Sequence, residues 1–226
     1  MRDGPNATPF FETLLNSIDP AAEKAASTAL RTAAFDTRWE RNQPCDSVIA
    51  GGRIACVLSG AVRKFAIRVS GQRQIIDLLI SGDFFGLSKS DPTFLVEAVS
   101  NGTRVASFRK QQIDELASTF PAIAALIRGA ATDAIGRLEN HLLVQGRITA
   151  KAKVRAYLAE MCRRTGSNQS GSLALPITRY DIADHLGIAV ETVSRAMTAL
   201  RRRGSIALQT PRHIQIRDRA ILADVH

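Results

Sequence analysis

The stretch that decides the fold runs Thr178-Arg-Tyr-Asp-Ile-Ala-Asp-His-Leu-Gly-Ile-Ala-Val-Glu-Thr-Val-Ser-Arg-Ala-Met-Thr-Ala-Leu-Arg-Arg-Arg203. Gly187 divides it into two short segments. In the second segment Val193, Met197 and Leu200 recur at steps of four and three, which is the period of one buried helical stripe. The pattern predicts two helices around a glycine turn, a helix-turn-helix.

The first of these helices has a predicted start. Thr178 followed three residues later by Asp181 is a variant capping box, because each side chain can satisfy a free amide of the first turn. Ile182, Ala183 and Leu186 then supply the apolar side of the helix. The second helix begins after Ala189, which offers no side-chain cap, so we expect its N-terminal end to be less firmly held.

The exposed face of the second helix carries Glu191, Ser194, Arg195 and Thr198. In a DNA major groove Arg195 can pair with guanine O6 and N7, Glu191 can accept from a cytosine amino group, and Ser194 or Val190 can contact a thymine. The alternative is that Glu191 and Arg195, four residues apart, form only a surface ion pair.

Positive charge is concentrated beside this segment. Residues 147–226 hold 14 Lys and Arg against 6 Asp and Glu, whereas residues 1–146 hold 16 against 15. A basic patch neutralises DNA phosphates and makes affinity depend on salt. A membrane surface can use the same charge, but the segment lacks a long amphipathic helix with bulky apolar anchors.

Two short strands are predicted after the helices, at 206–208 and 213–217, joined by a turn at 209–212. They form a wing, whose tip residue Arg212 either reaches a phosphate or is a solvated turn arginine. Supporting DNA contacts are expected from Val190, Thr192, Thr178, Arg179, Arg212 and Thr198.

Composition limits the other possibilities. The chain has 226 residues, 45% of them hydrophobic, but no run near the ~18 apolar residues of a membrane span and no signal-peptide core, so we expect a cytoplasmic protein. Three unevenly spaced cysteines indicate neither a disulfide framework nor a zinc site. No phosphate loop, nucleophile elbow or metal-binding histidine cluster supports an enzyme, and no cofactor is predicted.

The N-terminal part alternates short β-rich runs with glycine turns, which predicts a small barrel or roll. A helix over about 21–34 precedes it. The predicted strands are 48–49, 54–58, 62–69, 74–80, 95–99 and 104–108.

A helical period follows from Pro121 to about Gln145, where the apolar positions are spaced as in a coiled coil. One interpretation is that this helix packs only on its own roll. We favour a partner helix from a second copy, because helix-turn-helix proteins read two half-sites through a twofold dimer. The seam residues are Ala124, Ala131, Ile135, Leu138 and Leu142. A further helix is predicted from Lys151 to Arg164.

The expected architecture is α+β with three parts. A β-roll domain with an N-terminal helix occupies residues 1–118, a dimerisation helix 119–146, and a winged helix-turn-helix domain 147–226. In this order the parts resemble the Crp/Fnr family of bacterial transcription regulators. The specific matches are Gly82-Asp-Phe-Phe-Gly86 in the roll and Glu191-Thr-Val-Ser-Arg195 in the second helix.

The resemblance implies a target and partners. The Glu-x-x-Ser-Arg signature belongs to the Fnr and FixK branches, and it implies a palindrome with TTGA and TCAA half-sites read by Glu191, Ser194 and Arg195. It also implies double-stranded DNA, a second copy of the chain and RNA polymerase as partners, with activation as the commoner mode.

The resemblance also bears on what switches the protein. Cyclic-nucleotide members carry an arginine in a phosphate-binding cassette after the glycine turn, but residues 87–94 here hold no arginine, and Lys89 is a weak substitute. Three cysteines cannot supply a four-thiolate iron–sulfur cluster. The favoured interpretation is a FixK-like protein active without an effector. The alternative is an effector-gated regulator with haem or an unknown metabolite in the roll.

Cys162 adds a redox hypothesis. Arg163 and Arg164 flank it and would favour its thiolate if the side chain is exposed, so that oxidation would weaken DNA binding. The alternative is an inert, half-buried helix cysteine.

Overall fold

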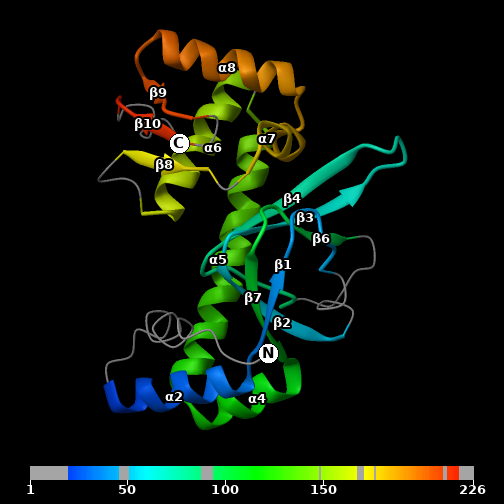
Figure 1. Ribbon diagram of the computed structural model, residues 1–226, viewed down its shortest axis with the longest axis vertical. Coiled ribbons are helices and arrows are strands. Elements are labelled where there is room, and N and C mark those ends of the chain that lie inside the picture. Colours follow the sequence, from blue (N-terminus) through cyan, green and yellow to red (C-terminus); the bar gives the residue numbers. More distant parts are fainter. Residues whose placement is uncertain are drawn as a thin grey trace. The chain divides into compact units, whose positions relative to one another are not determined.

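The computed structural model describes residues 20–45, 51–87, 94–147, 149–166, 171–175, 177–210 and 213–218 (Figure 1). The predicted strand at 48–49, Lys89 and Arg212 lie outside the described residues. Contacts divide the chain into two compact units, one of residues 1–66 and 77–137 and the other of residues 67–76 and 138–226.

The first unit is built on two antiparallel sheets. One has the strand order β1-β7-β2-β5 and the other β4-β3-β6. Their bounds are β1 Phe35–Trp39, β2 Arg53–Ser59, β3 Ala61–Ile67, β4 Arg73–Ile80, β5 Phe84–Phe85, β6 Leu95–Ala98 and β7 Thr103–Arg109. Their inward faces share one apolar core that includes Trp39, Val57, Leu79, Phe85 and Val105.

Helices cover a second core of the same unit. They are α2 (Pro20–Ala33), α4 (Lys110–Thr119) and the first turns of α5 (Pro121–Gln145). Leu30, Ile113 and Ile123 pack there with Phe108 of β7. Gly86 closes the turn after β5 at φ +76°, and a Cβ at this position would lie 2.4 Å from the Arg53 carbonyl oxygen. The predicted glycine-punctuated roll is thus confirmed.

Besides the two-residue strand β5, three described elements of the first unit and of the wing were not predicted. β1 presents only Trp39 to the core, and α4 is mostly polar and buries only Ile113. β8 (Ser172–Ala174) begins at the last residue of segment 165–172, whose polar sequence predicts a loop. Each gains its stability from packing or pairing with distant residues, so the local pattern is weak.

The second unit contains α6 (Ala150–Arg164), α7 (Arg179–Leu186), α8 (Val190–Arg202), β9 (Ile206–Leu208) and β10 (His213–Ile216). β8, β10 and β9 form a three-stranded antiparallel sheet in that order. Its core is formed by Val154, Leu158, Ile182, Leu186, Val193, Leu200 and Ile214, all nearly inaccessible to solvent. The predicted helices and both wing strands are therefore present.

Candidate nucleic-acid interface

α7 is held at both ends by the residues that the sequence predicted. The Thr178 hydroxyl accepts from the Asp181 amide at 3.2 Å, and Asp181 Oδ2 accepts from the Thr178 amide at 3.0 Å and from its hydroxyl at 2.6 Å. At the other end Gly187 adopts φ 63°, ψ 38°, the left-handed geometry that glycine tolerates best. The capping box is confirmed, and it fixes where α7 starts.

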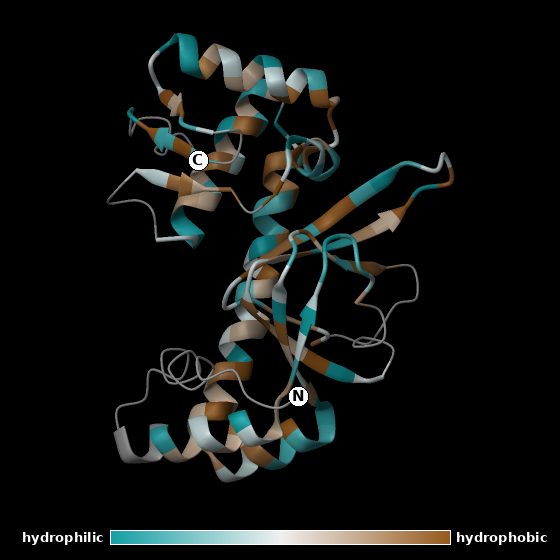
Figure 2. Cartoon of the chain, viewed as in Figure 1, coloured by the Kyte–Doolittle hydropathy of each residue, from teal (hydrophilic) through white to brown (hydrophobic). Residues whose placement is uncertain are grey.

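The buried stripe of α8 is also confirmed. Val193, Met197 and Leu200 are buried, and Ala196 joins them. Figure 2 shows hydrophobic and hydrophilic residues alternating around this helix, as in an amphipathic helix. Ala189 makes no side-chain cap, as expected. Packing, rather than capping, therefore anchors α8.

The predicted base readers lie on the other face of α8. Glu191 and Arg195 are exposed and Ser194 is half-buried. Both charged residues are described, and no ion pair joins them; Arg195 Nη2 instead donates to Thr192 Oγ1 at 3.4 Å. The surface ion-pair alternative is therefore not the arrangement found, and the Glu191 carboxylate and Arg195 guanidinium face solvent.

One contact inside this face was not predicted. Arg179 Nη1, from the first turn of α7, donates to Ser194 Oγ at 3.3 Å. The Nε of the same guanidinium is buried and has no hydrogen-bond partner within the described residues. The sequence predicts Arg179 and Ser194 as separate DNA contacts, whereas in the structure a hydrogen bond links them across the two helices.

Thr178 has a structural role at the start of α7. Its hydroxyl and its amide are both engaged in the capping box. A DNA contact by this residue stays a prediction.

The apolar stripe of α5 is open to solvent in the single chain. Ile135 is 58% exposed, Leu138 42% and Leu142 70%, while Ala124 and Ala131 are half-buried. Such exposure is unusual for large apolar side chains at helical spacing. The second half of the predicted seam therefore does not pack on the roll.

A buried ion-pair triad lies in the first unit. Arg137 of α5 donates from Nε and Nη2 to Asp77 of β4 and from Nη1 to Asp83, at 3.2 Å in each case. Its side chain is only 8% exposed. Burial lowers the pKa of Arg137, but the two carboxylates outweigh burial and raise it above its ordinary value. Arg137 thus binds the Gly82–Gly86 turn through Asp83. The sequence pattern did not reveal this contact.

The structure corrects the redox hypothesis for Cys162. Its side chain is buried, and burial raises the pKa of its thiol. An exposed thiolate was the condition for the redox hypothesis, and this condition is not met. Of the two neighbouring arginines, Arg163 is exposed and pairs with Glu160, and Arg164 is half-buried.

Two histidines, His141 of α5 and His185 of α7, lie against each other. His141 Nδ1 lies 3.2 Å from His185 Nε2, and the rings are 4.2 Å apart. Burial, and secondarily the charge of His141, lowers the pKa of His185 to about 3. Within the described residues no three His, Cys, Asp or Glu side chains gather as a metal site.

Among the helices that the structure describes, none combines the length and the apolar character that a bilayer crossing requires. Comparison with known proteins identifies residues 152–225 as a Crp-like helix-turn-helix domain. The nitrogen fixation regulation protein FixK of Rhizobium meliloti is 37% identical over 161 residues, covering 71% of this chain and 72% of the relative. The chain belongs to the Crp/Fnr family.

Other relatives place it in the FixK-like branch. FixK of Azorhizobium caulinodans is 33% identical over 210 residues, 89% of this chain and 84% of that protein. The structure of FixK2 from Bradyrhizobium japonicum superposes with a TM-score of 0.73 at 29% identity, covering 85% of this chain and 96% of FixK2. This Crp/Fnr chain is thus a FixK-like transcription activator with a DNA-binding helix-turn-helix.

Proposed function

We propose that this protein binds a palindrome with TTGA and TCAA half-sites as a homodimer and activates transcription there without a small-molecule effector. The observation that carries the proposal is the outer face of α8. An acid, a hydroxyl and a guanidinium project from a helix whose other face is buried. These groups match the donors and acceptors of the major groove.

The charge of the chain supports DNA as the partner. The excess of 14 basic over 6 acidic residues in 147–226 favours phosphate contacts and counterion release. Arg212 is proposed to contact a phosphate, Val190, Thr192 and Thr198 to line the groove, and Arg179 to support DNA reading through the Ser194 hydroxyl. A regulator of this kind has no use for a catalytic group and works in the cytoplasm with RNA polymerase.

The proposed dimer rests on the open stripe of α5. A second copy of α5 would cover Ile135, Leu138 and Leu142, and Ala131 would continue the same seam. Two reading units related by a twofold axis would then meet the two halves of a palindrome.

Effector independence is supported by the sequence of residues 87–94, which hold no arginine for the phosphate of a cyclic nucleotide. The competing function, an effector-gated regulator with haem or a metabolite in the roll, requires that the free protein bind DNA poorly. Because the Cys162 thiol is buried, redox control through it is not part of the proposal.

Selection of random duplex DNA by the purified, effector-free protein tests these points together. We expect enrichment of a twofold palindrome with TTGA-type half-sites, and the same selection with Arg195→Ala should lose preference at one base pair of each half-site. Recovery of no common sequence would refute effector-independent reading. An absorption spectrum with a Soret band would support the haem alternative.

A further inference from the structure

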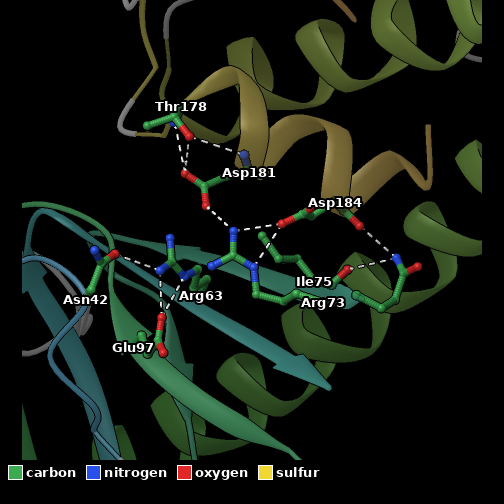
Figure 3. Close-up of polar contacts among 9 residues, drawn as sticks. Asn42, Arg63, Arg73, Ile75, Glu97, Thr178, Asp181 and Asp184 are labelled. Carbon is green, nitrogen blue, oxygen red and sulfur yellow. Dashed lines mark hydrogen bonds and ion pairs between the residues drawn. The ribbon is translucent and has the colours of Figure 1, made fainter. Parts of the chain in front are cut away.

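The start of strand β4 takes part in the DNA-reading unit although it precedes α7 by about 110 residues. Residues 67–76 belong to the second unit. Arg73 Nε and Nη2 donate to Asp184 Oδ2 at 2.9 and 2.7 Å, and Nη2 also reaches Asp181 Oδ1 at 3.3 Å. Figure 3 shows this guanidinium between the two α7 carboxylates.

The ion pair with Arg73 matters because the Asp181 carboxylate is buried. The side chain is 2% exposed, and a buried carboxylate needs both an opposite charge and hydrogen bonds. Oδ2 is already engaged by the amide and hydroxyl of Thr178. Arg73 binds the other oxygen, so one residue of β4 completes the charge balance of the capping box that starts α7.

A second pair of contacts holds the next turn of α7. Asp184 lies three residues after Asp181 and therefore on the same helix face. Its carboxylate accepts two donors from Arg73, and Gln74 Nε2 donates to its backbone oxygen at 2.9 Å. Both turns of this short helix are thus fixed by adjacent residues of β4.

We propose that Arg73 is a positioning residue for DNA reading, which holds α7 through Asp181 and Asp184 and thereby holds α8 in its reading position. The inference rests on the proposed function, because α8 is the helix that would enter the groove. It follows from packing: Ile182 and Leu186 of α7 share the buried core with Val193 and Leu200 of α8, so α7 cannot shift without disturbing α8.

Arg73 does not behave as a phosphate ligand in this arrangement. A phosphate-binding arginine presents free donors to solvent, whereas the Arg73 side chain is 27% exposed and directs three hydrogen bonds to carboxylates. An ordinary surface ion pair would contribute little, but the buried Asp181 partner sets this pair apart.

The test compares Arg73→Ala with Arg73→Lys and with Arg31→Ala, which removes an exposed arginine of α2 and so matches the loss of charge. Affinity for the selected operator and for a scrambled duplex is measured across a salt series, well below the unfolding temperature. For Arg73→Ala we expect about tenfold weaker operator binding with scrambled-duplex binding nearly unchanged. Arg73→Lys should fall between, because lysine keeps the charge but not the fork of donors, and Arg31→Ala should match the wild type.

Amide hydrogen exchange gives a readout that does not depend on DNA. Arg73→Ala, and independently Asp184→Asn, should raise exchange in residues 178–187 while the β2–β7 pairing in the first unit keeps its protection. Asp184→Asn leaves the capping box intact, so it remains informative if Arg73→Ala folds poorly.

The opposing outcomes are distinct. Equal losses on operator and scrambled duplex, with a shallower salt slope, would make Arg73 a phosphate contact. Unchanged or tighter operator binding would overturn the positioning role. If the wild type itself fails to distinguish operator from scrambled duplex, the proposed function fails. Unchanged exchange in α7 of the Arg73→Ala and Asp184→Asn variants would refute only the positioning role of Arg73.

Discussion

The reading face of α8 and the interior of the first unit use charge in opposite ways. On the reading face of the second unit, Glu191 and Arg195 are exposed and unpaired with each other. In the first unit charged groups turn inward and pair with residues far away in the chain. Arg137 binds Asp77 and Asp83, and Arg63 of β3 binds Glu97 of β6 (Figure 3).

This difference separates recognition from construction. An exposed charge keeps its hydration until a partner replaces it, so it is available for DNA. A buried pair has already exchanged hydration for fixed geometry, and its main effect appears when one member is removed. Mutations of the exposed reading-face charges and of the buried pairs of the first unit should therefore affect different observables: DNA discrimination in one case and stability in the other.

The largest effect should be a loss of stability on removal of the buried Arg137 guanidinium. Arg137→Met leaves Asp77 and Asp83 buried without the guanidinium, and we expect the free energy of unfolding to fall by about 3–5 kcal/mol. Urea denaturation measures the change. Arg128→Met, which removes an exposed arginine of the same helix, should change stability by less than about 0.5 kcal/mol. Similar values for the two variants would show that the triad is not a structural element.

The next largest effect should be the loss of the proposed dimer interface on α5. Leu138→Asp places a charge in the proposed seam of α5, so we expect monomers that bind the operator at least about 100-fold more weakly, because the second half-site is no longer tethered. Sedimentation gives the mass and DNA titration the affinity. Leu143→Asp is the control, since Leu143 is an exposed leucine of the same helix, at 69% against 42% for Leu138, but lies outside the seam. Dimers of unchanged stability would refute the seam.

Arg195→Ala tests the role of the exposed charges on the reading face of α8. Loss of a pairing with guanine should cost about 1–3 kcal/mol on the operator and relax preference at one base pair. Arg202→Ala removes an equal charge from the exposed last turn of α8 and should weaken all duplexes alike. Competition titrations with single-base operator variants distinguish the two patterns. Uniform weakening by Arg195→Ala would mean that this residue contacts phosphate only.

The same contrast explains what the sequence could predict. The capping box, the glycine turn, the α8 stripe and the bounds of α5 arise from residues within about two helical turns of each other, so their periodicity and spacing reveal them. The Arg137 triad and the Arg73 contacts join residues between 54 and 111 positions apart. No local pattern specifies such pairs, and the exposure of Cys162 depends likewise on the packing of a whole unit.

The smallest expected effect is on base discrimination by Ser194, which lies on the reading face beside Arg179. Because Arg179 Nη1 donates to Ser194 Oγ, one lone pair of the hydroxyl is engaged and its proton is left to donate outward, toward an acceptor on a base. Arg179→Met should therefore reduce discrimination at the base pair read by Ser194 by about 0.5–1.5 kcal/mol.

A double-mutant cycle measures this coupling. If the guanidinium acts through the hydroxyl, Arg179→Met in the Ser194→Ala background should change discrimination at that base pair by less than its effect in the wild type. A phosphate contact by Arg179 would instead weaken every duplex equally in both backgrounds and lower the salt slope by about one. Full additivity of the two substitutions would show that Ser194 reads DNA without Arg179, and that even within the reading face the side chains act singly.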